Sequence, residues 1–176
     1  YPELNAVINN AGIMVPERIA SAPGNLADAE ATIVTNLLGP IRLTSALLPH
    51  LLGQKDATVM TVSSGLAFVP LASTPAYSAT KAAIHSWSMA IREQLKNTSV
   101  QVIELAPPYV QTELLGEFQA SDPNAMPLAE FVDEVMAILS ANPDIEEVIV
   151  ERCKPLRHAA ENGNLKQLFD MLAASH

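Results

Sequence analysis

Tyr77 and Lys81 stand four residues apart in a stretch whose apolar pattern predicts a long helix. Their side chains are therefore expected on one helix face, one turn apart. A free phenol has a pKa of about 10 and transfers protons poorly at neutral pH. A neighbouring ammonium favours the phenolate, so we expect Lys81 to lower the pKa of Tyr77. The pair predicts a proton-transfer site, although the same spacing also occurs on ordinary helix surfaces.

A serine hydroxyl is expected beside Tyr77. Ser64 lies thirteen residues earlier, at the end of the preceding predicted strand. A right-handed connection between strand and helix can bring that strand end against the first turn of the helix. The Ser64 hydroxyl could then hold a carbonyl oxygen that receives a proton from Tyr77. Serine is also a common turn former, so Ser64 alone would carry little weight.

The elements that must position these residues follow from the apolar pattern. Short apolar runs alternate with longer amphipathic stretches, which is typical of βα repeats and a parallel sheet. We therefore expect an α/β, doubly wound fold with about four parallel strands and helices on both faces. The predicted strands cover residues 4–8, 57–62, 100–106 and 146–151, and the predicted helices cover residues 26–52, 75–97, 127–141 and 164–174.

Polar residues follow three of the predicted strands: Asn9-Asn10, Ser63-Ser64, and the stretch from Tyr109 to Thr112. In open α/β sheets, ligands bind at the carboxyl ends of the strands. We therefore expect these three segments to contribute to one site.

Four motifs together resemble the short-chain dehydrogenase/reductase (SDR) family in their order and separations: Asn9-Asn10-Ala11-Gly12, Asn36-Leu37-Leu38-Gly39, Ser63-Ser64 and Tyr77-x-x-x-Lys81. The resemblance covers nearly the whole chain and implies a single Rossmann-like domain over residues 1–176. It also implies an NAD(P)-dependent oxidoreductase that interconverts an alcohol and a carbonyl by hydride transfer. Two long helices form the subunit interface in this family, which implies a homodimer or homotetramer.

The resemblance assigns roles residue by residue. Tyr77 would exchange the proton, Lys81 would lower its pKa and bind the nicotinamide ribose, and Ser64 would orient the substrate oxygen. The fourth catalytic residue would be Asn36, placed where its helix is locally disturbed and holding a water that extends the proton relay. Residues expected to contact NAD or NADP are Asn10, Ala11, Gly12, Tyr77, Lys81, Val110 and Thr112.

The sequence departs from the family in two places. Pro107-Pro108 replaces the usual Pro-Gly turn, which fixes φ and removes an amide donor. The glycine-rich phosphate loop has no counterpart, because the seven glycines are widely spaced. Since the sequence begins at Tyr1 rather than Met, we expect a domain that is incomplete at its N-terminus. The strand over residues 4–8 would then be an exposed apolar edge.

Two other functions stay open at this point. Ser78-Ala79-Thr80-Lys81 matches the Ser-x-x-Lys pattern of some hydrolases. A cofactor-independent hydrolase or esterase could use Ser64 or Ser78 with Tyr77 and Lys81. The second alternative is a non-catalytic fragment derived from the family that only binds a partner.

Composition argues against several other classes of protein. A formal net charge of −9 argues against nucleic-acid binding, which needs clustered Lys and Arg. No run of about 18 apolar residues occurs, so no membrane span is expected. The single cysteine, Cys153, fits a reducing, cytoplasmic location. No metal is expected from the spacing of the four histidines, His50, His85, His158 and His176. The expected partner is a small alcohol or carbonyl compound.

Overall fold

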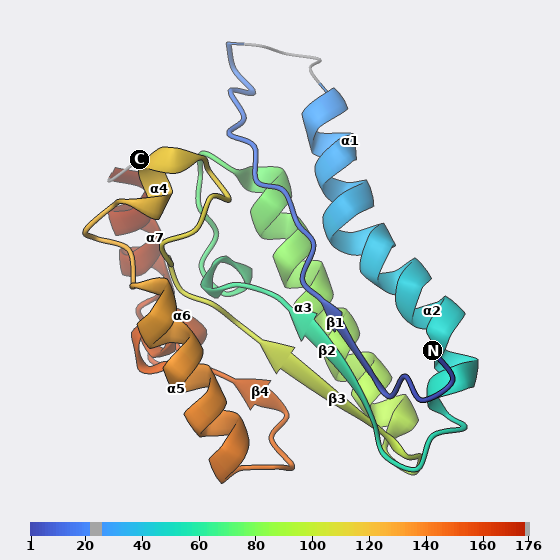
Figure 1. Ribbon diagram of the computed structural model, residues 1–176. Helices are drawn as coiled ribbons and strands as arrows, with labels where there is room; N and C mark the ends of the chain where they lie inside the picture. The colour runs from blue at the N-terminus through green and yellow to red at the C-terminus, as the bar shows by residue number, and fades with distance from the viewer. Residues whose placement is uncertain (22–25, 175–176) are drawn as a thin grey trace.

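Four parallel strands form one sheet in the computed structural model, which describes residues 1–21 and 26–174 (Figure 1). In the order β1-β2-β3-β4, they are β1 (Ala6–Asn9), β2 (Ala57–Val62), β3 (Val100–Leu105) and β4 (Glu147–Val148). The prediction for β2 matches its bounds, whereas β4 is shorter than residues 146–151. Because every neighbouring pair is parallel, the carboxyl ends of all four strands lie at the same edge.

The helices follow the predicted stretches, with one local irregularity. The stretch 26–52 becomes α1 (Ala27–Ile33), a π-helical segment η1 (Val34–Leu38) and α2 (Gly39–Leu51). The other long helices are α3 (Pro75–Leu95), α5 (Leu128–Ala141) and α7 (Leu165–Ala174). Short turns form η2 (Gly65–Ala67), α4 (Glu117–Ala120), η3 (Glu151–Cys153) and α6 (Lys154–Arg157).

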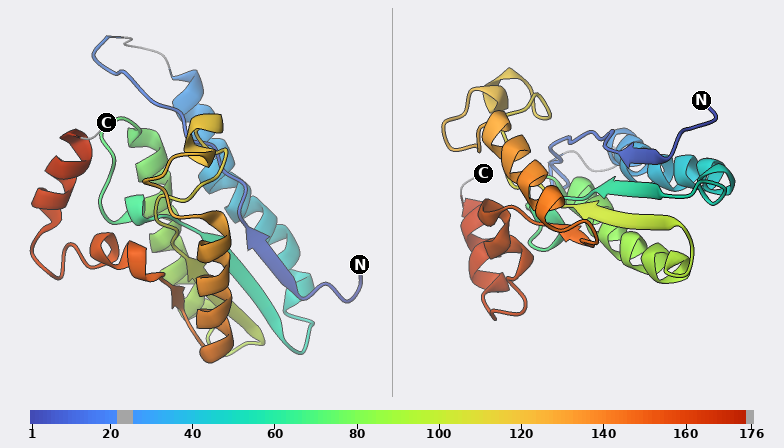
Figure 2. Two further views of the ribbon diagram at one scale, coloured as in Figure 1. Left: turned by 60° about the vertical axis from the view of Figure 1, so that its left-hand side comes forward. Right: turned by 60° about the horizontal axis from the view of Figure 1, so that its bottom comes forward.

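Helices cover both faces of the sheet, as predicted (Figure 2). β3 carries apolar side chains on both faces of the sheet, because successive side chains of a strand point to opposite faces. Val100 and Val102 pack with Leu51 of α2 and Leu95 of α3, together with Ala57 and Val59. The alternate residues Ile103 and Leu105 pack on the other face, against Phe131 and Val135 of α5. The doubly wound α/β fold is therefore confirmed.

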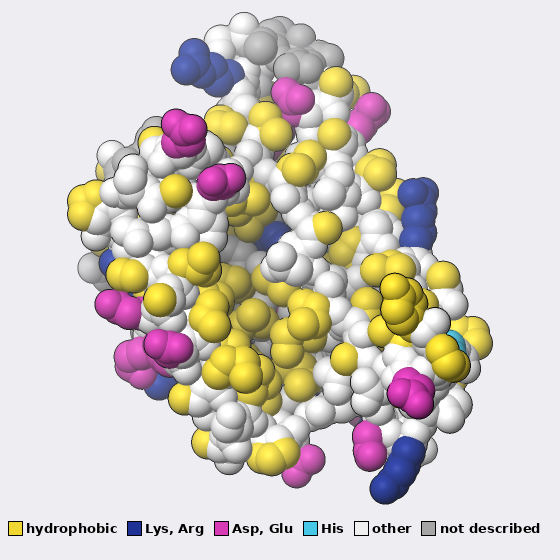
Figure 3. Space-filling view, viewed as in Figure 1, with side chains coloured by type: hydrophobic (Ala, Val, Ile, Leu, Met, Phe, Trp, Pro, Cys, Tyr) yellow, Lys and Arg dark blue, Asp and Glu magenta, His cyan; other side chains and the backbone are white. Residues whose placement is uncertain are grey.

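The edge strand β1 leaves part of the sheet open. Ile8 pairs with Met60 and is 61% exposed, while Met60 is only half-buried. Figure 3 shows a hollowed area of hydrophobic side chains on this side of the molecule. The expected apolar edge is thus present.

The continuous helical run Ala27–Leu51 is long and apolar enough to cross a membrane by length and composition alone. It was not expected to do so, because no uninterrupted apolar run occurs. Its buried residues are largely polar and hold it to the rest of the fold: Asn36 bonds to Thr80 of α3, and Thr44 bonds to Asn9 of β1. Such attachments are those of a helix packed on its own domain.

Candidate active site

Asn36 lies in the π-helical segment, where the widened turn holds its side chain against a distant stretch of backbone. Its Oδ1 accepts a 2.8 Å hydrogen bond from Ile13 N, and its Nδ2 donates one of 2.8 Å to Ile13 O. Nδ2 also lies 3.3 Å from Thr80 Oγ1 on α3. Asn36 therefore fixes the segment after β1 next to α3, and the expected irregularity of its helix is present.

Lys81 is buried one helical turn after Tyr77. Its Nζ donates a 2.8 Å hydrogen bond to Val62 O, at the carboxyl end of β2, and lies 5.4 Å from the centroid of the Tyr77 ring. The backbone of Gly12 approaches the same place: a Cβ there would lie 3.4 Å from Asn36 Oδ1 and 3.7 Å from Lys81 Nζ. Glycine at this position leaves room beside both groups.

The Ser64 hydroxyl lies close enough to the Tyr77 hydroxyl to lower the pKa of Tyr77. Ser64 follows β2 and precedes η2, and its Oγ accepts a 3.1 Å bond from Leu66 N, which fixes the side chain. The strand end and the first turn of α3 thus meet as the sequence predicts. Ser64, Tyr77, Lys81 and Asn36 form one continuous group at the carboxyl edge of the sheet.

The predicted direction of the Tyr77 pKa shift is wrong for this structure. Burial raises the pKa of Tyr77 to about 12, and the nearby Ser64 hydroxyl only partly opposes this rise. Burial also lowers the pKa of Lys81 to about 8, because the charged ammonium loses hydration. The expectation considered only the attraction between ammonium and phenolate, whereas removal from water has the larger effect here.

The other predicted contact residues lie at the ends of neighbouring strands. Asn10 and Ala11 are exposed after β1, while Asn9 Nδ2 bonds to Thr44 Oγ1 at 3.0 Å and so secures β1 to α2. After β3, Val110 is buried and Thr112 is half-buried.

Two positioning residues were missed from the sequence. Gln119 Nε2 donates to Val110 O at 2.8 Å and to Thr112 Oγ1 at 3.1 Å. Glu17 Oε1 accepts from Ala76 N at 2.8 Å and caps the first turn of α3, directly before Tyr77. These three bonds join segments that no local pattern relates, so the sequence offered no signal for them.

The Ser78 side chain has a structural role inside the fold. It is buried, and its Oγ accepts a 3.1 Å hydrogen bond from Leu71 N in the loop before α3. This placement does not favour Ser78 as the nucleophile of a hydrolase.

The site fits the nicotinamide and ribose end of a dinucleotide. The buried Lys81 ammonium has three N–H donors, of which Val62 O accepts one, and it forms no ion pair within residues 1–21 and 26–174. The remaining donors suit ribose hydroxyls. Residues matching a phosphate-binding loop do not occur in the sequence, whose glycines are isolated from one another.

Known proteins resemble this chain in sequence. The profile of the family described as short chain dehydrogenase matches residues 1–123. The oxidoreductase DltE of Bacillus subtilis (strain 168) is 46% identical over 114 residues, which cover 65% of this chain and 45% of DltE. The oxidoreductase SSP0419 of Staphylococcus saprophyticus is 30% identical over 117 residues, covering 66% of this chain and 49% of SSP0419. The chain therefore spans about half the length of these two relatives.

The fold also matches solved structures. A short chain dehydrogenase from Burkholderia cenocepacia J2315, crystallised in complex with NADP, superposes with a TM-score of 0.81 at 26% sequence identity. The match covers 97% of this chain and 71% of that protein. Because the family profile matches more than half of this chain, the chain belongs to the short-chain dehydrogenase family.

Proposed function

We propose that this chain carries the catalytic groups of an NAD(P)-dependent oxidoreductase that interconverts an alcohol and a carbonyl compound, with Tyr77 as the acid and base. The observation that carries the proposal is the convergence of Ser64, Tyr77 and Lys81 at the carboxyl end of β2, with the Lys81 ammonium 5.4 Å from the centroid of the Tyr77 ring and bonded to Val62 O. Family membership and the NADP complex of the similar dehydrogenase support the choice of cofactor.

The protonation state of Tyr77 suits carbonyl reduction. A phenol with a pKa of about 12 is protonated at neutral pH and can donate to an oxygen on which negative charge develops. The Ser64 hydroxyl holds that oxygen beside the phenol. A bound nicotinamide would supply the hydride to the carbonyl carbon, or accept it from the alcohol in the opposite direction.

Lys81 can serve both binding and proton supply. Its pKa of about 8 places the loss of a proton near physiological pH, so it can return a proton toward Tyr77. Its unused N–H donors can bind the ribose of the nucleotide. Asn36 acts as a positioning residue, because it fixes Ile13 and the neighbouring Gly12 next to Lys81 Nζ.

The test uses the native product of the gene that encodes these residues. Reduction and oxidation are followed with NAD and NADP over a panel of small aldehydes, ketones and alcohols. We expect turnover with at least one nucleotide and a loss of about 10²-fold or more in kcat for Ser64→Ala. Ser86→Ala is the matched control, because Ser86 is exposed on α3.

Three results would contradict the proposal. Full activity in Ser64→Ala would remove Ser64 from the reaction. Hydrolysis of p-nitrophenyl esters without nucleotide, abolished by Ser64→Ala, would instead support the hydrolase alternative. Absence of both turnover and nucleotide binding would support the non-catalytic alternative.

We further propose that two copies associate through α1–α2 and α3, as the family resemblance implies. These helices carry several partly exposed apolar side chains, among them Ile33, Val34, Leu43 and Met89. Sedimentation equilibrium should give a dimer or tetramer that Leu43→Glu dissociates. A monomer at all concentrations would contradict this assembly. The cytoplasmic location stays a prediction.

A further inference from the structure

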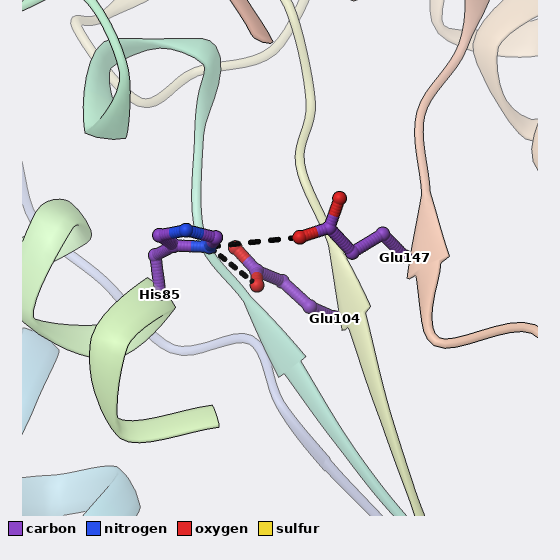
Figure 4. A group of neighbouring side chains, drawn as sticks. All are labelled: His85, Glu104 and Glu147. Carbon is purple, nitrogen blue, oxygen red and sulfur yellow. Dashed lines mark hydrogen bonds and ion pairs between the residues drawn. The ribbon is translucent and has the colours of Figure 1, made fainter. Parts of the chain in front are cut away.

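A second polar cluster lies one turn beyond Lys81 on α3, and the proposed reaction does not use it. It consists of His85 on α3, Glu104 on β3 and Glu147 on β4 (Figure 4). His85 Nδ1 lies 2.8 Å from Glu104 Oε2 and 3.9 Å from Glu147 Oε1. One potential ligand atom from each residue lies within 4.8 Å of the other two.

Glu104 is the unusual member. Its side chain is 0% exposed, and its Oε1 has no hydrogen-bond partner in the described part of the chain. A buried carboxylate oxygen without a partner is strongly unfavourable unless a cation or donor approaches it. Figure 4 shows the carboxylates of Glu104 and Glu147 both directed toward the His85 ring. Glu104 thus brings a buried carboxylate with one unpartnered oxygen to this cluster.

Charge in the cluster is also unbalanced. Two carboxylates face one imidazole. Within the cluster Arg157 pairs with Glu147, through bonds from Nε to Oε2 at 2.9 Å and from Nη2 to Oε1 at 3.3 Å, and outside it Arg157 also pairs with Glu161. With His85 neutral, one negative charge remains in a buried place. A cation bound between the three side chains would balance it.

We propose that His85, Glu104 and Glu147 bind a Zn²⁺ ion. Zn²⁺ accepts both imidazole nitrogen and carboxylate oxygen as ligands, whereas Mg²⁺ and Ca²⁺ prefer oxygen ligands alone. A water would complete four-coordination. The arrangement needs a neutral His85 with its proton on Nε2, which leaves Nδ1 free to coordinate.

Arg157 fits the role of an outer partner that orients a ligand carboxylate. Its guanidinium carbon lies 4.9 Å from the centroid of the Phe68 ring, and that ring meets His85 edge-on with 4.8 Å between centroids. Phe68 thus packs between Arg157 and His85 and restricts both. Because the three ligands come from α3, β3 and β4, a bound ion would cross-link three elements.

The test measures zinc on the native gene product rather than its activity. The protein is loaded with ZnCl₂, dialysed against metal-free buffer, and analysed for bound metal by mass spectrometry. We expect about one zinc per chain and a rise in melting temperature that EDTA reverses. His85→Gln and Glu104→Gln should each weaken zinc binding by about tenfold or more.

A matched control comes from the surface of the same protein. His158 is half exposed and lies 4.0 Å from Glu161, so His158→Gln should leave zinc binding unchanged. Because Glu104 is buried and its variant could fold poorly, Glu147→Gln at the more accessible edge provides a second test, with circular dichroism as the check on folding.

Two outcomes overturn the proposal. Less than about one-tenth of an equivalent of zinc on the folded protein would show that the cluster does not hold the ion. Zinc retained undiminished by both His85→Gln and Glu147→Gln would place the ion elsewhere. Neither outcome bears on hydride transfer, so failure of the zinc site and failure of the oxidoreductase proposal are distinguishable.

Discussion

Replacement of Asn36 by alanine tests how the site is held together. The change removes two 2.8 Å hydrogen bonds to the backbone of Ile13 and the weaker 3.3 Å contact with Thr80. Ile13 is half-buried, so water can replace only part of what is lost. At ~1 kcal/mol for each bond, and more for a group left unpaired, the loss is about 2–4 kcal/mol. Alanine has a better helix propensity than asparagine, which offsets about 0.5 kcal/mol of this loss in the free energy of unfolding.

The assay is urea unfolding followed by circular dichroism. A net loss of about 1.5–3.5 kcal/mol lowers the midpoint by roughly 1–2 M when the dependence on urea is about 2 kcal/mol/M. Asn97→Ala is the control, because Asn97 is exposed after α3, and it should change stability by less than ~0.5 kcal/mol. Asn36→Asp keeps the size of the side chain but sets an oxygen against Ile13 O, so we expect it to be at least as destabilising at neutral pH.

Asn36→Ala should also weaken nucleotide binding, because Asn36 fixes the backbone beside Gly12 and Lys81 Nζ. Equal urea midpoints for Asn36→Ala and Asn97→Ala would refute the reasoning. So would a stable Asn36→Asp protein beside an unstable Asn36→Ala protein, since that result would assign the effect to lost volume rather than to hydrogen bonding.

Two further predictions concern Lys81 and Gly65. The folded-state pKa of Lys81 is about 8 and its ordinary value is 10.5, so the unfolded chain binds more protons between these pH values. Stability relative to Lys81→Met should therefore rise with pH across this window, by up to about 3 kcal/mol, and a flat difference between pH 7 and 10 would contradict it. At Gly65, an added Cβ would lie 2.8 Å from Leu156 Cδ1, at the end of a flexible side chain, and 3.3 Å from Cys153 Sγ, so Gly65→Ala should destabilise by about 1 kcal/mol. In a Leu156→Ala background the same change should cost less than ~0.5 kcal/mol in thermal unfolding, and an undiminished cost would disprove the clash.

Much of the fold follows from the sequence because the apolar pattern is regular. Residues 57–62 match β2, and the two long helical stretches were expected within a few residues of their observed ends. Helix spacing also brought Tyr77 and Lys81 to one face, and the parallel connection brought Ser64 to Tyr77. These relationships depend on local geometry or on a single strand-to-helix connection.

Relationships between distant segments were not available from any pattern. Asn36 contacts Ile13 across 23 residues, and Gln119 fixes the segment that carries Val110 and Thr112. The raised pKa of Tyr77 depends on burial by the whole surrounding fold, which spacing alone does not describe. Short elements such as α6 were missed because four residues are too few for a periodic signal.

The same limit explains the cluster on α3, β3 and β4. His85, Glu104 and Glu147 are separated by 19 residues or more in sequence and share no motif spacing. Only the packing of α3 on β3 and the pairing of β3 with β4 bring them together. The proposed zinc site therefore has no counterpart in the spacing of the histidines along the sequence.

The most direct measurement of the central proposal is Tyr77→Phe, which removes the hydroxyl and keeps the ring that packs near Lys81. Nucleotide affinity is measured by fluorescence titration, and kcat is measured with the best substrate of the panel. The account predicts nearly unchanged nucleotide affinity and a kcat lowered by about 10²–10⁴-fold. A kcat within about twofold of the unaltered protein would contradict the assignment of Tyr77 as the acid and base.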